Sequence, residues 1–533
     1  MQLVAYGAQD VYLTGSPQIT FFKIIYRRHT NFSVEPIPQT FTGNSDFGRT
    51  VTCTINRNGD LITNMYTMIN LRNVASTGDK WGYVRRLGLA IVQHYKIEIG
   101  GSKIDEQYGD WLNIWWELSH KVGQERGFAR MVGDVPELTT IDASEKPSYT
   151  LYVPLQFWFN RHNGLALPLI ALQYHDVRVT IDFRQASQCV NKETVMDIEP
   201  SVSMAEASLI IDYVYLDSEE RKRFAQASHE YLIEQLQFTG SETLTSTNNK
   251  YRLNFNHPCK FLVWAPHLEK YSTRTEYVVY GQDWESARER FAKHLWLSTR
   301  ADLVASGNSW AITTNSSSTH EVIDPAGNGV FDETLVKAQL VFSNYTSGES
   351  EAVSADNVVI LENNLTMYHM SLNVASLVDA YSATDDSMAA YLASVSVKVQ
   401  DHFNYGNYLD ATNNPVSSAK LQLNGSDRFQ ERDGYYFNYV QPFQHFSNTP
   451  ADGVNTYSFA LKPEDHQPSG TCNFSRIDNA TLQVKLGLDN QTADNTYSAN
   501  FIGANSNSLL NIYAFNYNVL RVMSGMAGTA YSN

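Results

Sequence analysis

The sequence has few cysteines, few charged residues and no long apolar run. Its four cysteines are Cys53, Cys189, Cys259 and Cys472, scattered over 533 residues without a CxxC pair or a matching histidine spacing. This distribution does not indicate a zinc site, and so low a density is typical of synthesis in a reducing cytoplasm, although it leaves disulfides open. No window approaches 18 uninterrupted apolar residues, and residues 1–10 lack the basic flank and apolar core of a signal peptide. We therefore expect a soluble chain that is not secreted by the standard route.

Motifs of enzyme active sites are missing as well. The sequence contains no HExxH, GxSxG, GxGxxG or phosphate-binding GxxxxGK motif. His445 and His466 come nearest to a metal cluster, but they stand far apart and lack a carboxylate at ligand spacing. Asp385–Asp386 and the pair of Glu431 and Asp433 resemble acid/base pairs, yet such residues are more often acids of turns and loops. We expect no enzyme activity, no metal and no cofactor.

Length and composition indicate a large folded protein that is rich in strands. A chain of 533 residues exceeds one ordinary hydrophobic core, so we expect two domains of roughly 200 to 250 residues. Apolar residues make up 43% and charged residues only 18%, which excludes a disordered chain. The 31 Tyr and 25 Phe favour β-structure. A formal net charge of −16 gives no electrostatic footprint for a phosphate backbone, so we expect no direct contact with nucleic acid.

The most informative stretch is Leu151 to Phe183, which combines aromatic strand sequence, a turn and a second strand. Alternate residues from Val153 to Phe159 would share one face of an extended run, with Trp158 on the opposite face or in a subunit contact. Asn163-Gly164 predicts a turn with positive φ. From Val177 to Phe183 apolar and polar residues alternate strictly, which predicts a half-buried antiparallel strand. Runs at Thr50–Leu71 and Leu89–Ile104, broken by Asn-Gly-Asp and Gly-Gly, predict further strands joined by tight turns.

A helix is predicted at Gly109–Val122, where Trp111, Trp115 and Trp116 recur near helical spacing. The tryptophans could stack on a ligand, but we favour a helix packed over the open end of a sandwich. A second helix is predicted after the β run Ser208–Leu216, because Asp217 with Glu220 three residues later resembles a capping box. Its alternating charges indicate an exposed connection between two domains, and flanking acids neutralise a nucleic-acid patch there.

The second half of the chain begins and ends with strand sequence. Strands are expected at Cys259–Ala265 and Ile512–Val519, and a helix at Asp283–Leu297. Polar loops are expected at Ser298–Asn328, Ser343–Asp356 and Ala375–Ser396. Asn315 and Asn344 are sequons within the first two of these loops, and they are our candidates for glycosylation.

Seven stretches of the chain resemble, in order, motifs of the major capsid proteins of large nucleocytoplasmic DNA viruses. They are Val11–Ser33, Asn56–Ile62, Ile99–Leu118, Leu151–Phe183, Tyr213–Gln237, Tyr439–Asp478 and Asn516–Asn533. The resemblance implies an all-β fold of two tandem eight-stranded antiparallel jelly rolls, with a few short helices and long loops in the second. We place an N-terminal arm at residues 1–30, the first jelly roll at 31–217, a helical linker at 218–229 and the second jelly roll at 230–533.

The resemblance also implies a structural function in the virion. Homotrimers would form pseudo-hexameric capsomers that tile an icosahedral shell, assembled in the host cytoplasm. Expected partners are further copies of the chain, neighbouring capsomers, minor capsid and penton proteins, and an internal viral membrane reached through the N-terminal arm. The basic residues Lys23, Arg27 and Arg28 of this arm suit an acidic partner or anionic lipid, or contacts with the protein's own underside. Alternatives are a β-sandwich carbohydrate-binding module or glycosidase, and a minor or penton protein of the same viruses.

Overall fold

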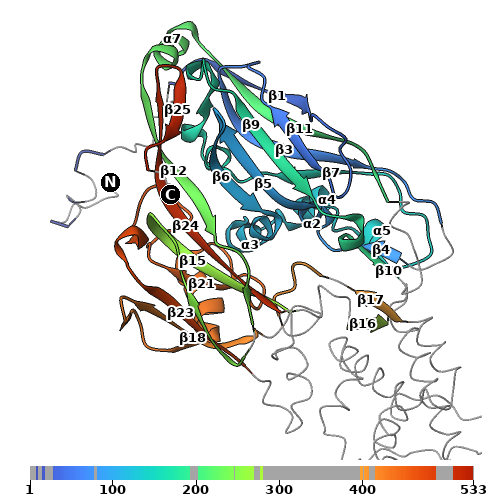
Figure 1. Ribbon diagram of the computed structural model, residues 1–533. Helices are drawn as coiled ribbons and strands as arrows, with labels where there is room; N and C mark the ends of the chain where they lie inside the picture. Colours follow the sequence, from blue (N-terminus) through green and yellow to red (C-terminus); the bar gives the residue numbers. More distant parts are fainter. Residues whose placement is uncertain are drawn as a thin grey trace, which may run out of the picture.

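The fold consists of two antiparallel β-sandwiches in one chain (Figure 1). The computed structural model describes residues 28–76, 81–192, 202–244, 246–268, 401–406, 414–487 and 508–531, the short pieces 8–9, 12 and 15–17, and the backbone of 276–279 and 396–399. The expected helix Asp283–Leu297, the three polar loops, Asp385–Asp386, Asn315 and Asn344 lie outside these residues, except for the start of a strand at Ser396.

The first sandwich has eight main strands in two sheets. One sheet has the order β1-β11-β3-β7 and the other β2-β9-β5-β6. The strands are β1 (Phe32–Thr40), β2 (Thr50–Thr54), β3 (Leu61–Leu71), β5 (Val92–Ile99), β6 (Ser102–Tyr108), β7 (Tyr149–Pro154), β9 (Val177–Phe183) and β11 (Met204–Leu216). Numbered in chain order, they form sheets 1-8-3-6 and 2-7-4-5, which is the strand order of a jelly roll.

The second sandwich repeats this topology. Its sheets have the orders β12-β24-β15-β21 and β14-β23-β18-β19, again 1-8-3-6 and 2-7-4-5 in chain order. The strands are β12 (His229–Phe238), β14 (Asn248–Arg252), β15 (Pro258–His267), β18 (Val416–Leu423), β19 (Ser426–Asp427), β21 (Asn455–Ser458), β23 (Ala480–Leu486) and β24 (Leu509–Met523). The expected strands at Cys259–Ala265 and Ile512–Val519 are thus confirmed as parts of β15 and β24. Two tandem jelly rolls are the fold that we expected.

Smaller elements complete the two sandwiches. Short strands are β8 (Leu167–Pro168), β13 (Glu242–Thr243), β20 (Arg432–Asp433), β22 (Cys472–Asn473) and β25 (Met526–Thr529). A separate sheet has the order β16-β17-β10-β4, made of β16 (Glu276–Val279), β17 (Ser396–Val399), β10 (Val190–Lys192) and β4 (Trp81–Tyr83). The α-helices within the described residues are α2 (Leu87–Ile91), α3 (Gly109–Ser119), α4 (Glu125–Val132), α5 (Pro136–Thr139), α6 (Trp158–Arg161), α7 (Ser218–Gln226) and α14 (Gln441–His445). The other helices are η1 (Asn163–Leu165), η2 (Leu169–Ala171), η3 (Ala186–Gln188), η6 (Tyr436–Val440) and η7 (Phe474–Arg476).

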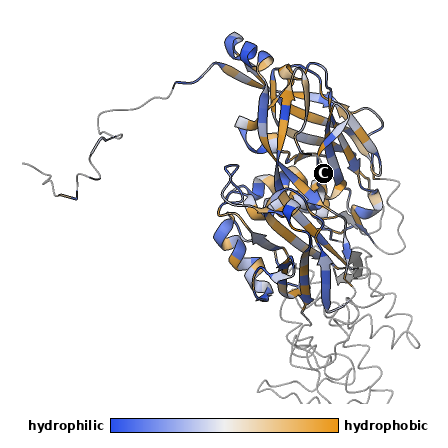
Figure 2. Cartoon of the chain, turned by 60° about the vertical axis from the view of Figure 1, so that its left-hand side comes forward, coloured by the Kyte–Doolittle hydropathy of each residue, from blue (hydrophilic) through white to orange (hydrophobic). Residues whose placement is uncertain are grey.

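Alternating sequence explains the strands of the first jelly roll. In β3, Met65 and Ile69 point into the core between the two sheets, while Tyr66 and Met68 between them are half-buried. Strand β9 follows the expected alternation, with Arg178 exposed between buried valines. Figure 2 shows hydrophobic and hydrophilic residues side by side along the strands. This period of two buries one face of each sheet, which supplies the apolar burial that stabilises a sandwich.

The stretch after β7 differs from our prediction of a continuous strand. The extended run ends at Pro154, and Trp158 begins the short helix α6. Phe157, Trp158 and Phe159 are all buried in the first core, so the proposed subunit contact of Trp158 is wrong. A helical turn points three consecutive aromatic side chains into one core, which an extended strand cannot do because its side chains alternate between faces.

The turn and loop predictions have mixed outcomes. The predicted positive φ at Asn163-Gly164 is wrong, because residues Asn163–Leu165 form the 3₁₀ helix η1, whose backbone has negative φ. His162 Nδ1 accepts the N–H of Gly164 at 3.0 Å. Gly100 and Gly101 do adopt positive φ, at 59° and 82°, in the tight turn between β5 and β6. The Asn-Gly-Asp sequence after β2 was also expected to form a tight turn between strands. It instead belongs to a loop that leads from β2 to β3 in the opposite sheet. Residues Leu87–Ile91 form helix α2 where the start of a strand was expected.

The exposed helix α7 begins where the capping residue predicted it. The carboxylate of Asp217 accepts the N–H of Ser218 at 2.7 Å, and Arg221 forms an ion pair with Asp60 at 2.8 Å. The helix projects at one end of the molecule beside β25, and Figure 2 shows it as largely hydrophilic. It connects β11 of the first jelly roll to β12 of the second.

Candidate functional site: the junction between the jelly rolls

Helix α3 forms the contact between the two jelly rolls. It begins directly after β6 of the first jelly roll and lies between the two sandwiches (Figure 1). The Trp111 ring stacks on Phe515 of β24 at 5.7 Å and on Phe261 of β15 at 6.1 Å. Trp115 stacks on the same two phenylalanine rings. These rings form an apolar cluster that buries the outer face of the sheet β12-β24-β15-β21.

This position corrects our expectation that α3 covers the open end of a sandwich. The helix ends at Ser119, earlier than predicted, and packs on the face of a sheet in the other domain. Trp111 is fully buried and Trp115 is 9% exposed. Because their stacking partners are side chains of the same chain, these rings are not free to stack on a ligand.

The first turn of α3 carries a buried carboxylate that is bonded to the second half of the chain. Asp110 accepts hydrogen bonds from the hydroxyls of Tyr405 and Tyr513, both at 2.6 Å, and from Asn511 at 3.2 Å. His267 Nε2 lies 3.2 Å from the same carboxylate. Burial opposes ionisation of Asp110, but His267 and the two tyrosine hydroxyls outweigh it and hold the pKa of Asp110 well below its usual value. The charged carboxylate therefore links α3 to the second sandwich.

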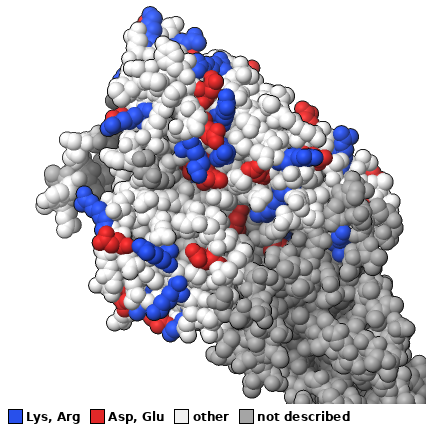
Figure 3. Space-filling model, in the orientation of Figure 1, with Lys and Arg blue, Asp and Glu red and all other residues white. Residues whose placement is uncertain are grey.

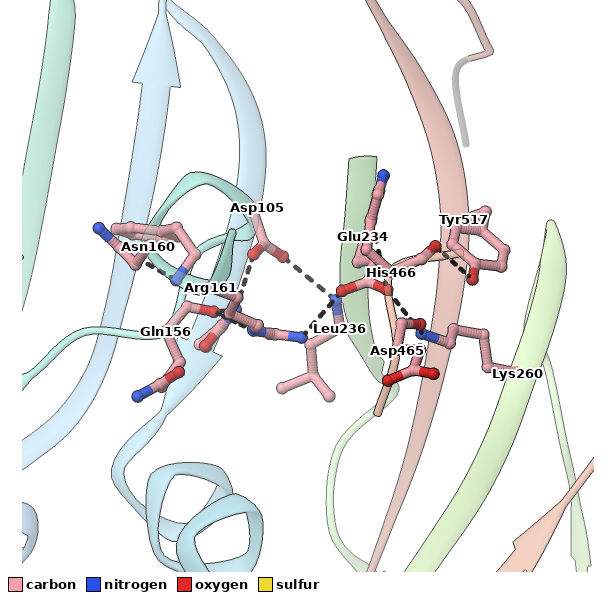
Figure 4. A network of polar contacts seen from close by, with 12 residues as sticks. Asp105, Gln156, Asn160, Arg161, Glu234, Leu236, Lys260, Asp465, His466 and Tyr517 are labelled. Carbon is pink, nitrogen blue, oxygen red and sulfur yellow. Dashed lines mark hydrogen bonds and ion pairs between the residues drawn. The ribbon is translucent and has the colours of Figure 1, made fainter. Parts of the chain in front are cut away.

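A second polar cluster, around Glu234, also crosses the junction (Figure 4). Glu234 of β12 accepts from Lys260 of β15 at 2.6 Å, and Arg161 of α6 reaches it from the first jelly roll at 3.3 Å. The exposed fractions of these side chains are only 4% for Glu234, 1% for Lys260 and 10% for Arg161. Arg161 also donates to the carbonyl of Gln156 at 2.8 Å, which fixes the direction of its guanidinium. Burial of these charges is tolerated because each is paired.

The cations of this cluster lie against aromatic rings of the second jelly roll. The guanidinium of Arg161 is 4.4 Å from the Phe515 ring centre and 4.8 Å from that of Trp115. Lys260 Nζ is 5.0 Å from the ring centre of Tyr517. Such cation–π contacts are strongest where water is excluded. Arg161 thus joins the aromatic contact and the ionic cluster into one junction.

Ionisation of Glu234 depends on its cationic neighbours. Burial opposes the charged carboxylate, but His466, Arg161 and Lys260 outweigh it and lower the pKa of Glu234. Burial also lowers the pKa of Lys260, while Glu234 acts against this effect. Loss of Glu234 would leave two buried cations, Arg161 and Lys260, without their shared carboxylate partner.

Asp105 of β6 makes a third contact across the junction. Its carboxylate accepts the N–H of Leu236, in β12, at 3.2 Å and the side-chain amide of Gln107 at 2.8 Å. Burial raises the pKa of Asp105 to about 7, against the effect of these hydrogen bonds and of Arg161. Gln235 donates to the carbonyl of Ile104 beside it. Strands β6 and β12 therefore lie side by side, one from each jelly roll.

The candidate site residues from the sequence do not form a reactive site. His466 Nδ1 is 3.8 Å from Glu234, whereas His445 bonds to the carbonyl of Leu461 elsewhere. Glu431 pairs with Lys485, and Asp433 accepts the N–H of Tyr435. Among the described residues, no group of three or more His, Cys, Asp or Glu side chains could hold a metal ion. All four cysteines are free thiols.

Sequence reasoning missed the residues that join the two jelly rolls. They are Asp105, Asp110, Arg161, Glu234 and Lys260. The signal was present for two of them, because Lys260 stands within the apolar run CKFLVWA and Glu234 within YLIEQL. A charge inside a buried strand requires a partner, although the sequence does not say which.

The surface shows no single-sign charge patch on the face drawn in Figure 3. Acidic and basic side chains are interspersed there, and much of the area is uncharged. No helix within the described residues has the length and apolar character needed to cross a membrane.

Comparisons with known proteins place the chain in one family. Residues 220–528 match the family model described as large eukaryotic DNA virus major capsid protein. Residues 20–217 match the model of the major capsid protein N-terminus. The chain belongs to the major capsid proteins of large eukaryotic DNA viruses. Capsid protein 1 of Acanthamoeba polyphaga mimivirus is 43% identical, and the match covers 100% of this chain and 99% of the relative. The major capsid protein of Phaeocystis pouchetii virus is 42% identical over the same shares.

Solved structures of capsid proteins share the fold. A chain of the quasi-atomic model of the PBCV-1 virus capsid matches with a TM-score of 0.63 and 34% identity, covering 96% of this chain and 100% of the other. The Faustovirus major capsid protein matches with a TM-score of 0.59 at 11% identity, covering 97% and 94%. The second match supports the double jelly roll alone. A major capsid protein is a component of the virion shell, and this function replaces our alternatives of a carbohydrate-binding module, a glycosidase and a minor capsid protein.

Proposed function

We propose that three copies of this chain associate into a capsomer with a pseudo-hexagonal outline, and that capsomers tile an icosahedral shell. The observation that carries the proposal is the repeated jelly roll. Each chain holds two sandwiches of the same strand order, joined by a buried junction. Three such chains supply six similar units, so that threefold symmetry fills a sixfold position in a lattice.

The buried junction gives this geometry its stiffness. Domains of one chain usually move relative to each other unless their interface is large and apolar. Here the aromatic cluster of α3 lies between two polar clusters, around Asp110 and around Glu234, that both cross the junction. A rigid angle between the two sandwiches suits a subunit that tiles a shell. The protein acts in this proposal as a structural component without enzyme activity or cofactor.

Further parts of the proposal concern partners and chain organisation. Residues 31–217 and 230–533 would be the two jelly rolls, joined by the linker 218–229. The arm of residues 1–30 would contact minor capsid proteins or an internal viral membrane, penton proteins would fill the fivefold positions, and assembly would take place in the host cytoplasm. The segments 298–328 and 343–356, with Asn315 and Asn344 as glycan candidates, would form the outer surface. The shell would enclose the genome without direct contact between this chain and nucleic acid.

Light scattering during size-exclusion chromatography tests the oligomer directly. The purified chain should elute with three times the 60.2 kDa chain mass across a tenfold range of concentration. A variant without residues 1–30 should keep this mass and lose only shell assembly. A wild-type protein that remains monomeric at the highest concentration would contradict the proposal.

A further inference from the structure

The second jelly roll contains a helix at the same topological position as α3. Helix α3 follows β6, the fifth main strand of its sandwich, and precedes β7, the sixth. In the second sandwich η6 and α14 follow β19, the fifth strand, and precede β21, the sixth. They form one continuous helical run from Tyr436 to His445. The two sandwiches therefore present equivalent helices.

The exposure of the two helices differs. Trp111 and Trp115 of α3 are buried on the second sandwich, whereas the run η6–α14 and the residue before it, Tyr435, carry an apolar stripe that faces solvent. Phe443 is 84% exposed, Tyr435 63% and Val440 40%. Tyr439 stacks on Tyr435 with ring centres 5.6 Å apart. Tyr435, Tyr439 and Phe443 follow one another at intervals of four, so they share one side of the helix. We call these four residues the helix stripe.

The sheets that correspond to each other differ in the same way. The sheet β12-β24-β15-β21 is covered on both faces, on the inner face by its own core and on the outer face by α3. Its counterpart in the first sandwich, β1-β11-β3-β7, is covered by a core on its inner face. Strand β15 is accordingly buried at eight consecutive residues, while β3 alternates between buried and half-buried residues after Thr63.

The outer face of β1-β11-β3-β7 carries an apolar strip between polar residues, with Asp212 on one side and the row Glu206, Asn70 and Thr150 on the other. Strand register aligns Pro38, Ile210, Tyr66 and Pro154 in one row across four strands. Met68 and Tyr152 form a neighbouring pair on the same face. All six side chains are half-buried or exposed. We call these six residues the sheet row.

We propose that the helix stripe of one copy packs on the sheet row of the next copy and repeats between chains the contact that α3 makes within the chain. The inference rests on the proposed trimer and names its interface. The junction within the chain is the template. Its helix α3 is the topological equivalent of the run η6–α14, and its sheet β12-β24-β15-β21 is the equivalent of β1-β11-β3-β7. Aromatic side chains on one partner and an apolar strip bordered by polar residues on the other suit a stable interface between proteins.

Such a contact joins two different surfaces and so propagates from chain to chain. A ring closes when the rotation per chain is one third of a turn. The six sandwiches of the ring are then joined by six contacts of the same kind. These contacts lie alternately within one chain and between two chains. No copy in the closed ring retains an exposed helix stripe or an exposed sheet row.

Two single substitutions and their mixture test the proposal. Phe443→Glu places a charge in the helix stripe, and Tyr152→Glu places one in the sheet row. Met526→Glu is the matched control, because Met526 is half-exposed in the hairpin of β24 and β25 and belongs to neither the helix stripe nor the sheet row. Because an unpaired charge is costly to bury, either interface variant should weaken association at least about tenfold, and the control should remain trimeric. Native mass spectrometry of the full-length chains measures the oligomers.

The mixture separates this interface from other arrangements. Each variant keeps the surface that the other has lost, so an equimolar mixture should form a heterodimer through one intact contact. Heterodimers also show that both variants are folded. The proposal is overturned if both variants remain trimeric, including the case in which they lose only the assembly of trimers into larger arrays. It is equally overturned if both are folded monomers by circular dichroism and the mixture gives no heterodimer. A monomeric wild type would instead contradict the trimer itself.

Discussion

The guanidinium of Arg161, in the first jelly roll, lies 3.3 Å from the carboxylate of Glu234, in the second. Arg161 belongs to the aromatic stretch that was the most informative part of the sequence, and Glu234 stands near the start of the second sandwich. The short helix α6 follows the strand that ends at Pro154, and its last residue, Arg161, reaches across the junction to Glu234. Motifs far apart in the chain therefore meet at one buried contact.

Removal of the Glu234 charge should destabilise the protein. Glu234→Gln leaves Arg161 and Lys260 buried without their carboxylate partner, and breaking a buried pair in this way costs about 3 to 5 kcal/mol. Urea denaturation followed by tryptophan fluorescence measures the change. The matched control is Glu230→Gln in the same strand, since Glu230 pairs with Arg521 at a site more than half exposed and such pairs contribute about 1 kcal/mol or less. Equal midpoints for the two variants would refute the role of the cluster.

Two tryptophan substitutions should have different consequences. Trp158→Ala removes a ring from the first core and should lower the stability of that jelly roll by about 3 to 5 kcal/mol.

Trp111→Ala removes the contact between the sandwiches, so the two jelly rolls should unfold in separate steps. Differential scanning calorimetry distinguishes one transition from two. A single, unshifted transition for Trp111→Ala would show that α3 does not couple the domains.

Acid should weaken the junction through Asp110. Its pKa is lowered in the folded protein, so its contribution to stability is fully present above the unfolded pKa of about 4 and is lost as pH falls through the folded pKa. Asp110→Asn should be less stable than the wild type at pH 7, and the difference should shrink toward pH 2. Thermal unfolding at a series of pH values gives both curves. A constant difference across this range would argue against a charged Asp110.

Asp105 should act with the opposite sign. Burial raises its pKa to about 7, so the folded protein binds a proton that the unfolded chain releases near pH 4. Its contribution to stability is greatest at low pH and declines as pH rises from about 4 to about 7. In Asp105→Asn this decline should be absent. Urea midpoints at pH 5 and pH 7.5 test it, and an equal drop in both proteins would contradict the raised pKa.

Local patterns in the sequence predicted much of the fold. Alternation identified β9 and much of β3 and β24, helical spacing identified α3, and Asp217 marked the start of α7. The double jelly roll itself came from resemblance, because periodicity does not fix the order in which strands pair. Trp158 was misplaced because the aromatic run was read as extended, whereas the chain forms a helical turn there and buries Phe157, Trp158 and Phe159 in one core.

The junction could not be predicted from local patterns. Its members come from α3, α6, β6, β12 and β15, and their meeting depends on how two finished sandwiches pack. Asp110 looks in sequence like an ordinary acid in the first turn of a helix, where it suits the helix dipole. Only the tertiary structure shows that the hydroxyls of Tyr405 and Tyr513 converge on it.

Electron microscopy of the purified full-length protein tests the central claim most directly. Class averages viewed along the symmetry axis should show three copies of the chain arranged as six similar lobes in a pseudo-hexagonal ring, each pair of lobes joined by the α3 junction. Particles containing one chain, or rings with a number of chains other than three, would contradict the account.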